Sequence, residues 1–161
     1  MPIKNNDELL KAFSWIVREI VRKVMLDMLK ELEDDINKYT YGQLPNVDYY
    51  DGSGYPTFQF LDAFTFTNVE NKLNTFVSEL YYNWQTMDYD GATGLHGNPY
   101  DGDLRHQLAD ILNTDYDINK PRQPYWDIFI TDMFDGGGIE KLFDKYTKSE
   151  FGKAGIQVIK I

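Results

Sequence analysis

Apolar residues recur at three- and four-residue steps along the N-terminal part of the chain. Asn5 followed by Glu8 fits a capping box, which satisfies free backbone N–H groups where a helix begins. The pattern predicts one amphipathic helix from about Asn6 to Tyr39. At about 1.5 Å per residue it would be roughly 50 Å long, more than a compact domain of this size easily covers, so part of its apolar stripe is expected to meet another chain. The stripe consists of Leu9, Leu10, Phe13, Ile16, Val17, Ile20, Val21, Val24, Met25, Met28, Leu29, Leu32 and Ile36.

The opposite face of this helix is charged, which is typical of a solvated surface. Glu19 and Lys23 also have the spacing of a helix-stabilising pair. The charged face is made of Lys11, Arg18, Glu19, Arg22, Lys23, Asp27, Lys30, Glu31, Asp34 and Asp35.

Glycines and prolines interrupt the chain from Thr40 to Pro56 and predict a long loop rich in tyrosine. Strand signals follow, because phenylalanines between positions 58 and 66 and apolar residues between 76 and 82 sit among threonines and valines. We favour an antiparallel pair with a break at Asn71-Lys72. A helix over Leu73 to Asn83 is the alternative, because apolar residues at 73, 76, 77 and 80 also fit a helical period.

Three segments are predicted between the strands and the last part of the chain. A glycine-rich stretch runs from Asp88 to Gly102, a short helix from Asp103 to Leu112, and a polar connector from Asn113 to Pro121.

A second long helix is predicted to begin at Pro124, which suits a first helical turn because its missing N–H is not needed there. Its pattern allows a break at glycines 136–138, after which Ile139, Leu142, Phe143 and Tyr146 resume it. Gly155 then introduces a predicted C-terminal edge strand over 156–161. The expected fold is therefore α+β, a single domain over 1–161 with a long N-terminal helix, a small antiparallel sheet, a second long helix and an edge strand.

The start of the second helix is apolar on several sides, which favours contact with a second subunit. Aromatic residues make up 16% of the chain, including 12 tyrosines, and tyrosine, tryptophan and arginine are common at protein interfaces. Stacking on bases is the competing use of such rings, but it normally accompanies a basic groove, and the aromatic loops here are acidic. The predicted interface residues are Arg122, Tyr125, Trp126, Phe129, Tyr49, Tyr50, Tyr55 and His96.

The charge balance narrows the choice of partner. With 26 acidic against 16 basic residues the net charge is −10, which argues against a binder of nucleic-acid backbones. Cysteine is absent, so disulfides and cysteine-based zinc sites are excluded. The sequence shows neither a signal peptide nor an apolar run of the roughly 20 residues that span a membrane. We therefore expect a soluble protein made in the cytosol, without a membrane partner.

No segment carries a recognisable catalytic or metal-binding motif. Tyr-Asp-Gly occurs at 50–52, 89–91 and 100–102, but Asp-Gly is a turn former and no twelve-residue calcium loop is present. His96 and His106 lack the His-Glu-x-x-His spacing of a zinc site. A phosphate-binding glycine loop and a Gly-x-Ser-x-Gly elbow are also missing. We expect no enzymatic activity, catalytic residue, metal or cofactor.

The order of these features resembles the phage neck and tail-completion proteins related to the tenth gene product of phage HK97. The resemblance is carried by segments 55–63, 95–105 and 121–126 and by the expected closing strand, and it spans nearly the whole chain. The chain departs from the family pattern at Ser53-Gly54, where Arg-Thr-Gly is expected, and by inserting Gln123. The resemblance implies a virion protein at the neck–tail junction, a ring subunit that contacts itself and neighbouring connector and tail proteins.

An acidic inhibitor or DNA mimic is the alternative function, because a small acidic chain could occupy a basic nucleic-acid channel. Such a mimic needs carboxylates on a rigid surface, whereas most of these lie in predicted loops. The aspartates concerned are Asp88, Asp90, Asp101, Asp103, Asp110, Asp115 and Asp117.

Overall fold

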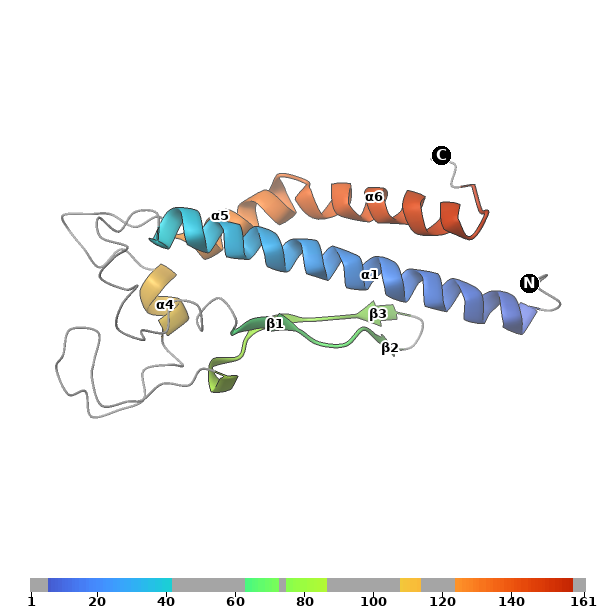
Figure 1. The fold of residues 1–161 in the computed structure, drawn as a ribbon, viewed down its shortest axis with the longest axis horizontal. Coiled ribbons are helices and arrows are strands. Elements are labelled where there is room, and N and C mark those ends of the chain that lie inside the picture. Colours follow the sequence, from blue (N-terminus) through green and yellow to red (C-terminus); the bar gives the residue numbers. More distant parts are fainter. Residues whose placement is uncertain (1–5, 42–62, 73–74, 87–107, 114–123, 158–161) are drawn as a thin grey trace. The chain divides into compact units, whose positions relative to one another are not determined.

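The longest element is helix α1 (Asn6–Ile36), which continues as the π-helical turn η1 (Asn37–Tyr41) (Figure 1). The computed structural model describes residues 6–41, 63–72, 75–86, 108–113 and 124–157, and these form an α+β fold. The predicted first helix is confirmed, and it extends to Tyr41, so the first two residues of the loop expected from Thr40 are still helical. The rest of that loop lies outside the described residues. The buried side chains of the helix are Ile16, Ile20, Val24, Met25, Met28, Leu32 and Ile36.

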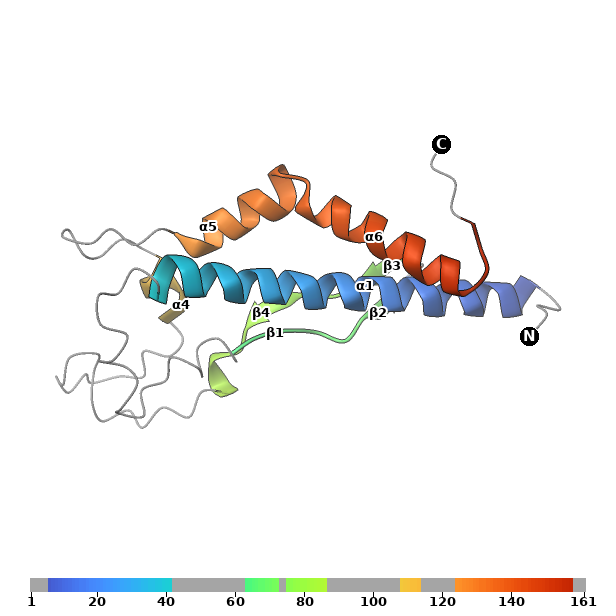
Figure 2. The same ribbon diagram turned by 45° about the horizontal axis from the view of Figure 1, so that its top comes forward.

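Four short strands replace the expected pair of longer ones (Figure 2). They form two two-stranded ladders, β1 with β4 and β2 with β3, and the second is antiparallel with Asn71 opposite Phe76. The antiparallel arrangement is confirmed and the helical alternative is wrong. The break expected at Asn71-Lys72 is also wrong, because both residues belong to a strand and positions 73–74 connect β2 to β3. The strands are β1 (Phe64–Phe66), β2 (Glu70–Lys72), β3 (Thr75–Val77) and β4 (Leu80–Tyr82).

The two ladders differ in register because one run carries an extra residue. The backbone N–H of Thr67 donates to the carbonyl of Glu79 at 2.9 Å, whereas Glu70 pairs with Val77. The three residue steps from Thr67 to Glu70 therefore lie opposite only two steps, from Val77 to Glu79. This is the pattern of a β-bulge. Side chains hold it: Ser78 Oγ donates to the Thr67 carbonyl at 2.7 Å, and Glu79 N–H donates to Thr67 Oγ1 at 3.0 Å. The bulge explains why the hairpin is divided.

Two short helical elements occur between the strands and the last helices. They are the 3₁₀ turn η2 (Trp84–Thr86) and helix α4 (Leu108–Asn113). The predicted short helix is confirmed near its end, while its start at Asp103 lies outside the described residues. The glycine-rich stretch expected over 88–102 and most of the polar connector also lie outside them.

The second long helix is divided at the predicted glycines. Helix α5 (Tyr125–Ile130) runs into the π-helical turn η4 (Thr131–Asp135), and α6 (Gly138–Lys153) begins three residues later. Gly137 has φ +69°, in the left-handed region that favours glycine, and the chain changes direction there. The break that the sequence allowed is thus confirmed.

Helix α6 ends in a Schellman motif rather than leading into a strand. Gly155 has φ +74°, its N–H donates to the Gly152 carbonyl at 3.0 Å, and the N–H of Ile156 donates to the Phe151 carbonyl at 2.9 Å. The edge strand expected from Ile156 is wrong at its first two residues, because Ile156 caps the helix and Gln157 is not in a strand. Positions 158–161 lie outside the described residues.

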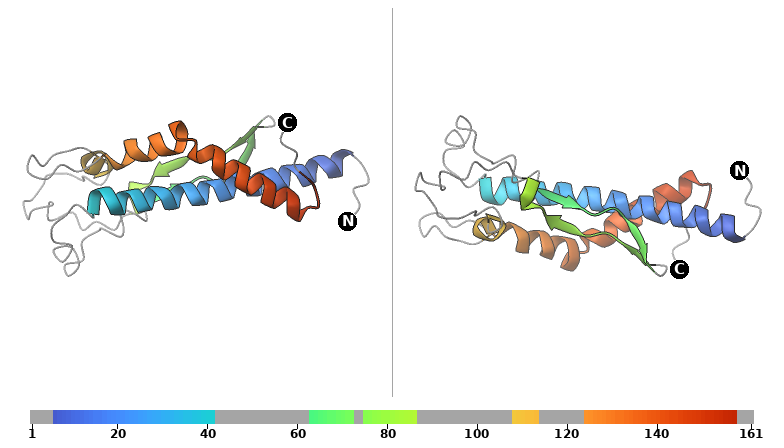
Figure 3. Two further views of the ribbon diagram at one scale, coloured as in Figure 1. Left: turned by 90° about the horizontal axis from the view of Figure 1, so that it is seen from above. Right: turned by 90° about the horizontal axis from the view of Figure 1, so that it is seen from below.

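The chain forms two compact units, each with its own core. The first unit contains Met1–Lys30, Phe66–Leu80 and Thr131–Ile161, and the second contains Glu31–Thr65 and Tyr81–Ile130. Within the first unit, α6 runs alongside α1 (Figure 3). The buried apolar side chains of the first unit are Ile16, Ile20, Val24, Met25, Met28 and Met133. Those of the second are Leu32, Ile36, Ala63, Phe64, Tyr125 and Phe129.

Candidate interaction surface

Five of the eight predicted interface residues lie outside the described part of the chain. They are Arg122, Tyr49, Tyr50, Tyr55 and His96. The interface role predicted for them stays a prediction.

The other three predicted residues lie on α5, and two of them are buried. Tyr125 and Phe129 are each 1% exposed. The Tyr125 hydroxyl donates to the Ala109 carbonyl at 3.1 Å, and the Trp126 N–H donates to Asn113 Oδ1 at 2.8 Å, so both residues join α5 to α4. Tyr125 and Phe129 therefore pack inside the second unit. The Trp126 ring is half-buried, 5.7 Å from the Phe129 ring.

A charged cluster joins α1 to α6 in the first unit. Glu150 is 6% exposed, and its Oε1 accepts hydrogen bonds from Lys153 Nζ at 2.8 Å and Lys23 Nζ at 2.5 Å. Two ammonium groups therefore neutralise one buried carboxylate, as such burial requires. The hydrogen bonds from Lys153 and Lys23 lower the pKa of Glu150 to about 2.

We expect this cluster to make the stability of the folded protein depend on pH in the acid range. Because the pKa of Glu150 is lower in the folded protein than its ordinary value of 4.5, the stabilisation is complete above pH 4.5 and is lost as pH falls toward about 2. Thermal melting followed by circular dichroism between pH 7 and pH 2 measures this. Glu150→Gln should melt at a lower temperature at neutral pH and lose less stability over the acid range. If the stability of Glu150→Gln fell with pH as steeply as that of the wild type, Glu150 would not be the source of the pH dependence.

A second polar contact between the same helices is built on Asp27. Its Oδ2 accepts from the Tyr146 hydroxyl at 2.6 Å and from Lys145 Nζ at 2.9 Å. The hydrogen bond that Tyr146 donates is the main reason that the pKa of Asp27 is lowered, and the one that Lys145 donates to Asp27 is the main reason that the pKa of Lys145 is raised. The tyrosine hydroxyl gives this exposed pair a fixed geometry.

These contacts correct two sequence expectations. Lys23 and Asp27 were assigned to a solvated face, yet both bind side chains of α6. The pair expected between Glu19 and Lys23 is also wrong, because Glu19 accepts from Arg22 at 3.1 Å instead. The partners Lys23 and Glu150 are 127 positions apart, so no local pattern could have revealed them.

The first unit exposes large apolar side chains on α1 and around α6. Trp15 is 62% exposed, Phe134 54%, Leu26 42% and Phe143 38%. Single exposed apolar residues are ordinary on a protein surface. An exposed tryptophan or phenylalanine beside a surface hollow, however, is typical of an interaction surface.

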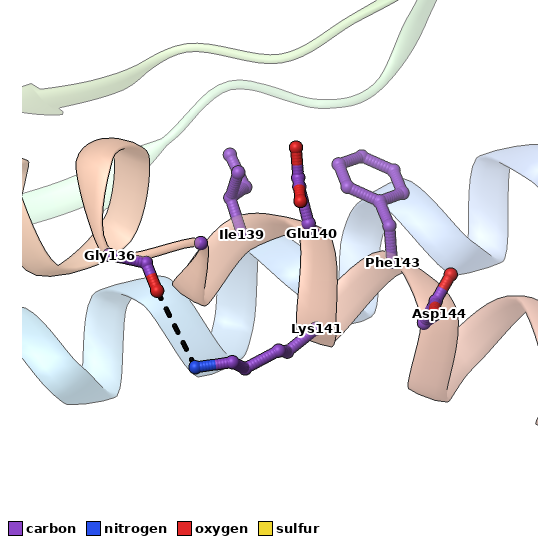
Figure 4. A pocket seen from close by; sticks show the side chains of 7 residues that line it. Gly136, Ile139, Glu140, Lys141, Phe143 and Asp144 are labelled. Atoms are coloured by element: carbon purple, nitrogen blue, oxygen red, sulfur yellow. Dashed lines mark hydrogen bonds between the residues drawn. The ribbon is translucent and has the colours of Figure 1, made fainter.

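A hollow of about 650 Å³ lies at the start of α6, between Gly136 and Asp144. We call it the α6 hollow. Figure 4 shows the side chains of Ile139, Glu140 and Phe143 pointing to one side of the helix, while Lys141 turns away toward the Gly136 carbonyl. That Lys141 ammonium donates to the Gly136 oxygen at 3.4 Å, so the hollow presents apolar and acidic groups.

A smaller hollow of about 290 Å³ lies on α1 and has the opposite charge. It is lined by Lys11, Ser14, Trp15 and Arg18, which we call the Trp15 face. These positions share one side of a helix because they are separated by three or four residues. An exposed indole between two cations can pack into an apolar hollow while its neighbours pair with carboxylates.

Among the described residues, no three His, Cys, Asp or Glu side chains are grouped so that they could hold a metal ion. Nor does that part of the chain contain a helix long and apolar enough to cross a membrane.

Comparison with known proteins adds no relative to this description: no family model, curated protein or solved structure matches the chain.

Proposed function

We propose that this chain is a non-enzymatic structural subunit of a virion, which builds a connector, neck or tail-completion ring by contacting copies of itself and neighbouring rings. The observation that carries the proposal is the exposed aromatic surface of the first unit, above all Trp15 at 62% and Phe134 at 54%. A subunit of an assembly needs such surfaces, because burial of aromatic rings is a main source of interface stability.

The internal contacts of the first unit support the same function. Helices α1 and α6 are joined by the Glu150 cluster and by the Asp27 contact, so the exposed rings of Trp15 on α1 and Phe143 on α6 are carried on helices fixed to each other. The rings of Phe13 and Phe151, 5.5 Å apart, add an apolar contact. A fixed surface loses little conformational entropy on assembly, which favours binding.

The mass of the native assembly tests the proposal. We expect the purified protein to form a closed multimer by native mass spectrometry and light scattering, and we expect the chain among the proteins of the mature particle. A protein that is strictly monomeric and absent from the particle would overturn it. Displacement of DNA from a basic protein by a monomer or dimer would instead favour the acidic inhibitor or DNA mimic.

A further inference from the structure

We infer that the subunits of this ring contact each other head to tail, with the Trp15 face of one copy docked into the α6 hollow of the next. This inference rests on the proposed function and names the self-contact that the ring requires. The two surfaces lie on different helices of the first unit, and their charges are complementary, because Lys11 and Arg18 line one and Glu140 and Asp144 line the other.

The Trp15 face supplies the basic side of the contact. The Trp15 ring is 62% exposed, and Lys11 and Arg18 lie four residues before it and three after it on the same side of α1. Both basic side chains are exposed. Tryptophan and arginine are the residue types that dominate interface hot spots.

The α6 hollow supplies the receiving part. Ile139 and Phe143 give it apolar walls, and the exposed carboxylate of Glu140 lies between them on the same side of the helix (Figure 4). Asp135 and Phe134 are exposed on η4 directly before it. Trp15 can thus pack against Ile139 and Phe143 while Lys11 and Arg18 meet Glu140 and Asp135.

Charge explains why the partner is a second copy joined through these particular faces. The chain carries a net charge of −10, which opposes contact between copies, so a contact that joins a basic surface to an acidic one is favoured. The Trp15 face and the α6 hollow satisfy this condition. Because the two faces differ, the contact is heterologous and generates a ring when its rotation closes.

The inference is tested by reversing the charges on each side separately. The double variant K11E/R18E has an acidic Trp15 face, and the double variant D135K/E140K reverses one acidic charge in the α6 hollow and one directly before it. Each variant alone should remain monomeric in sedimentation velocity. An equimolar mixture should assemble, because each contact in an alternating ring then joins opposite charges. Trp15→Ala should weaken wild-type self-association at least about 30-fold, the effect of losing a hot-spot side chain.

Two controls make the outcomes decisive. Lys148→Glu reverses another exposed charge on α6, outside the hollow, and should assemble like the wild type. Circular dichroism melting of every variant separates lost assembly from lost folding, and rescue by mixing cannot arise from unfolded chains.

The possible failures separate the inference from the proposed function. If the wild type assembles or enters particles while both charge-reversed variants do so equally well, the head-to-tail contact is overturned and the ring function stands. If the wild type is monomeric at all concentrations and absent from particles, the ring function fails as well. A mixture of the two variants that stays monomeric while the wild type assembles also overturns the contact.

Discussion

Replacing Phe129 by alanine is expected to lower the free energy of unfolding by about 3–5 kcal/mol, the usual cost of deleting a buried aromatic ring. Phe129 is 1% exposed and belongs to the same unit as buried Tyr125 and Leu32. The loss combines the lost burial of apolar surface with a cavity that the surroundings fill only in part. Urea unfolding followed by tryptophan fluorescence and by circular dichroism measures it.

Phe134→Ala is the matched control, five positions along the same segment. Its ring is 54% exposed, so truncation should cost less than about 1 kcal/mol, because little apolar surface returns to water. Under the proposed contact, this control should impair assembly instead. A Phe129→Ala protein of wild-type stability would contradict the burial of this ring and restore its candidacy as an interface residue.

Replacing Gly138 by alanine is expected to destabilise the protein by about 1–3 kcal/mol, the range found for overpacked sites. A Cβ at Gly138 would lie 2.8 Å from the carbonyl oxygen of Asp132 and 3.1 Å from Cα of Met133. Both neighbours are backbone atoms of η4, so relief requires the turn itself to move. That movement would also alter the α6 hollow, which begins at Gly136.

Gly152→Ala provides a control of the opposite sign on the same helix. Apart from its chain neighbours and the nearby backbone of the same helix, no atom lies within 4 Å of a Cβ built there, so alanine should stabilise the protein by about 0.5–1 kcal/mol through its higher helix propensity. The melting temperatures of the two variants should therefore shift in opposite directions from that of the wild type, which differential scanning calorimetry measures. Equal shifts in both variants would mean that the close approach at Gly138 is not maintained in solution.

Local patterns predicted the elements whose causes are local. The apolar period of α1 is a property of neighbouring residues, so the helix and its buried stripe from Ile16 to Ile36 could be read directly. The helix break at Gly137 and the antiparallel strands also follow from residue type and spacing. The position of the strand break could not be read, because a bulge held by Thr67 and Ser78 shifts the register.

The residues of the candidate surface could be predicted from the sequence only in part. The apolar residues of α5 indicated an excess of hydrophobic surface, but the pattern could not show which side chains are covered, and Tyr125 and Phe129 proved to be in the interior. Trp15 lies outside the predicted stripe of α1, although its position between Lys11 and Arg18 is visible in the sequence.

The sequence by itself determined the helices, the glycine turn that divides the second of them, and the strong net negative charge. Each of these depends on backbone preference, short-range spacing or composition, which act before the chain folds. Tertiary structure alone decided that Glu150 is buried between Lys23 and Lys153, because pairs distant in sequence meet only after the helices pack. It also decided which aromatic rings remain in water, since the exposure of a side chain depends on what the rest of the chain covers.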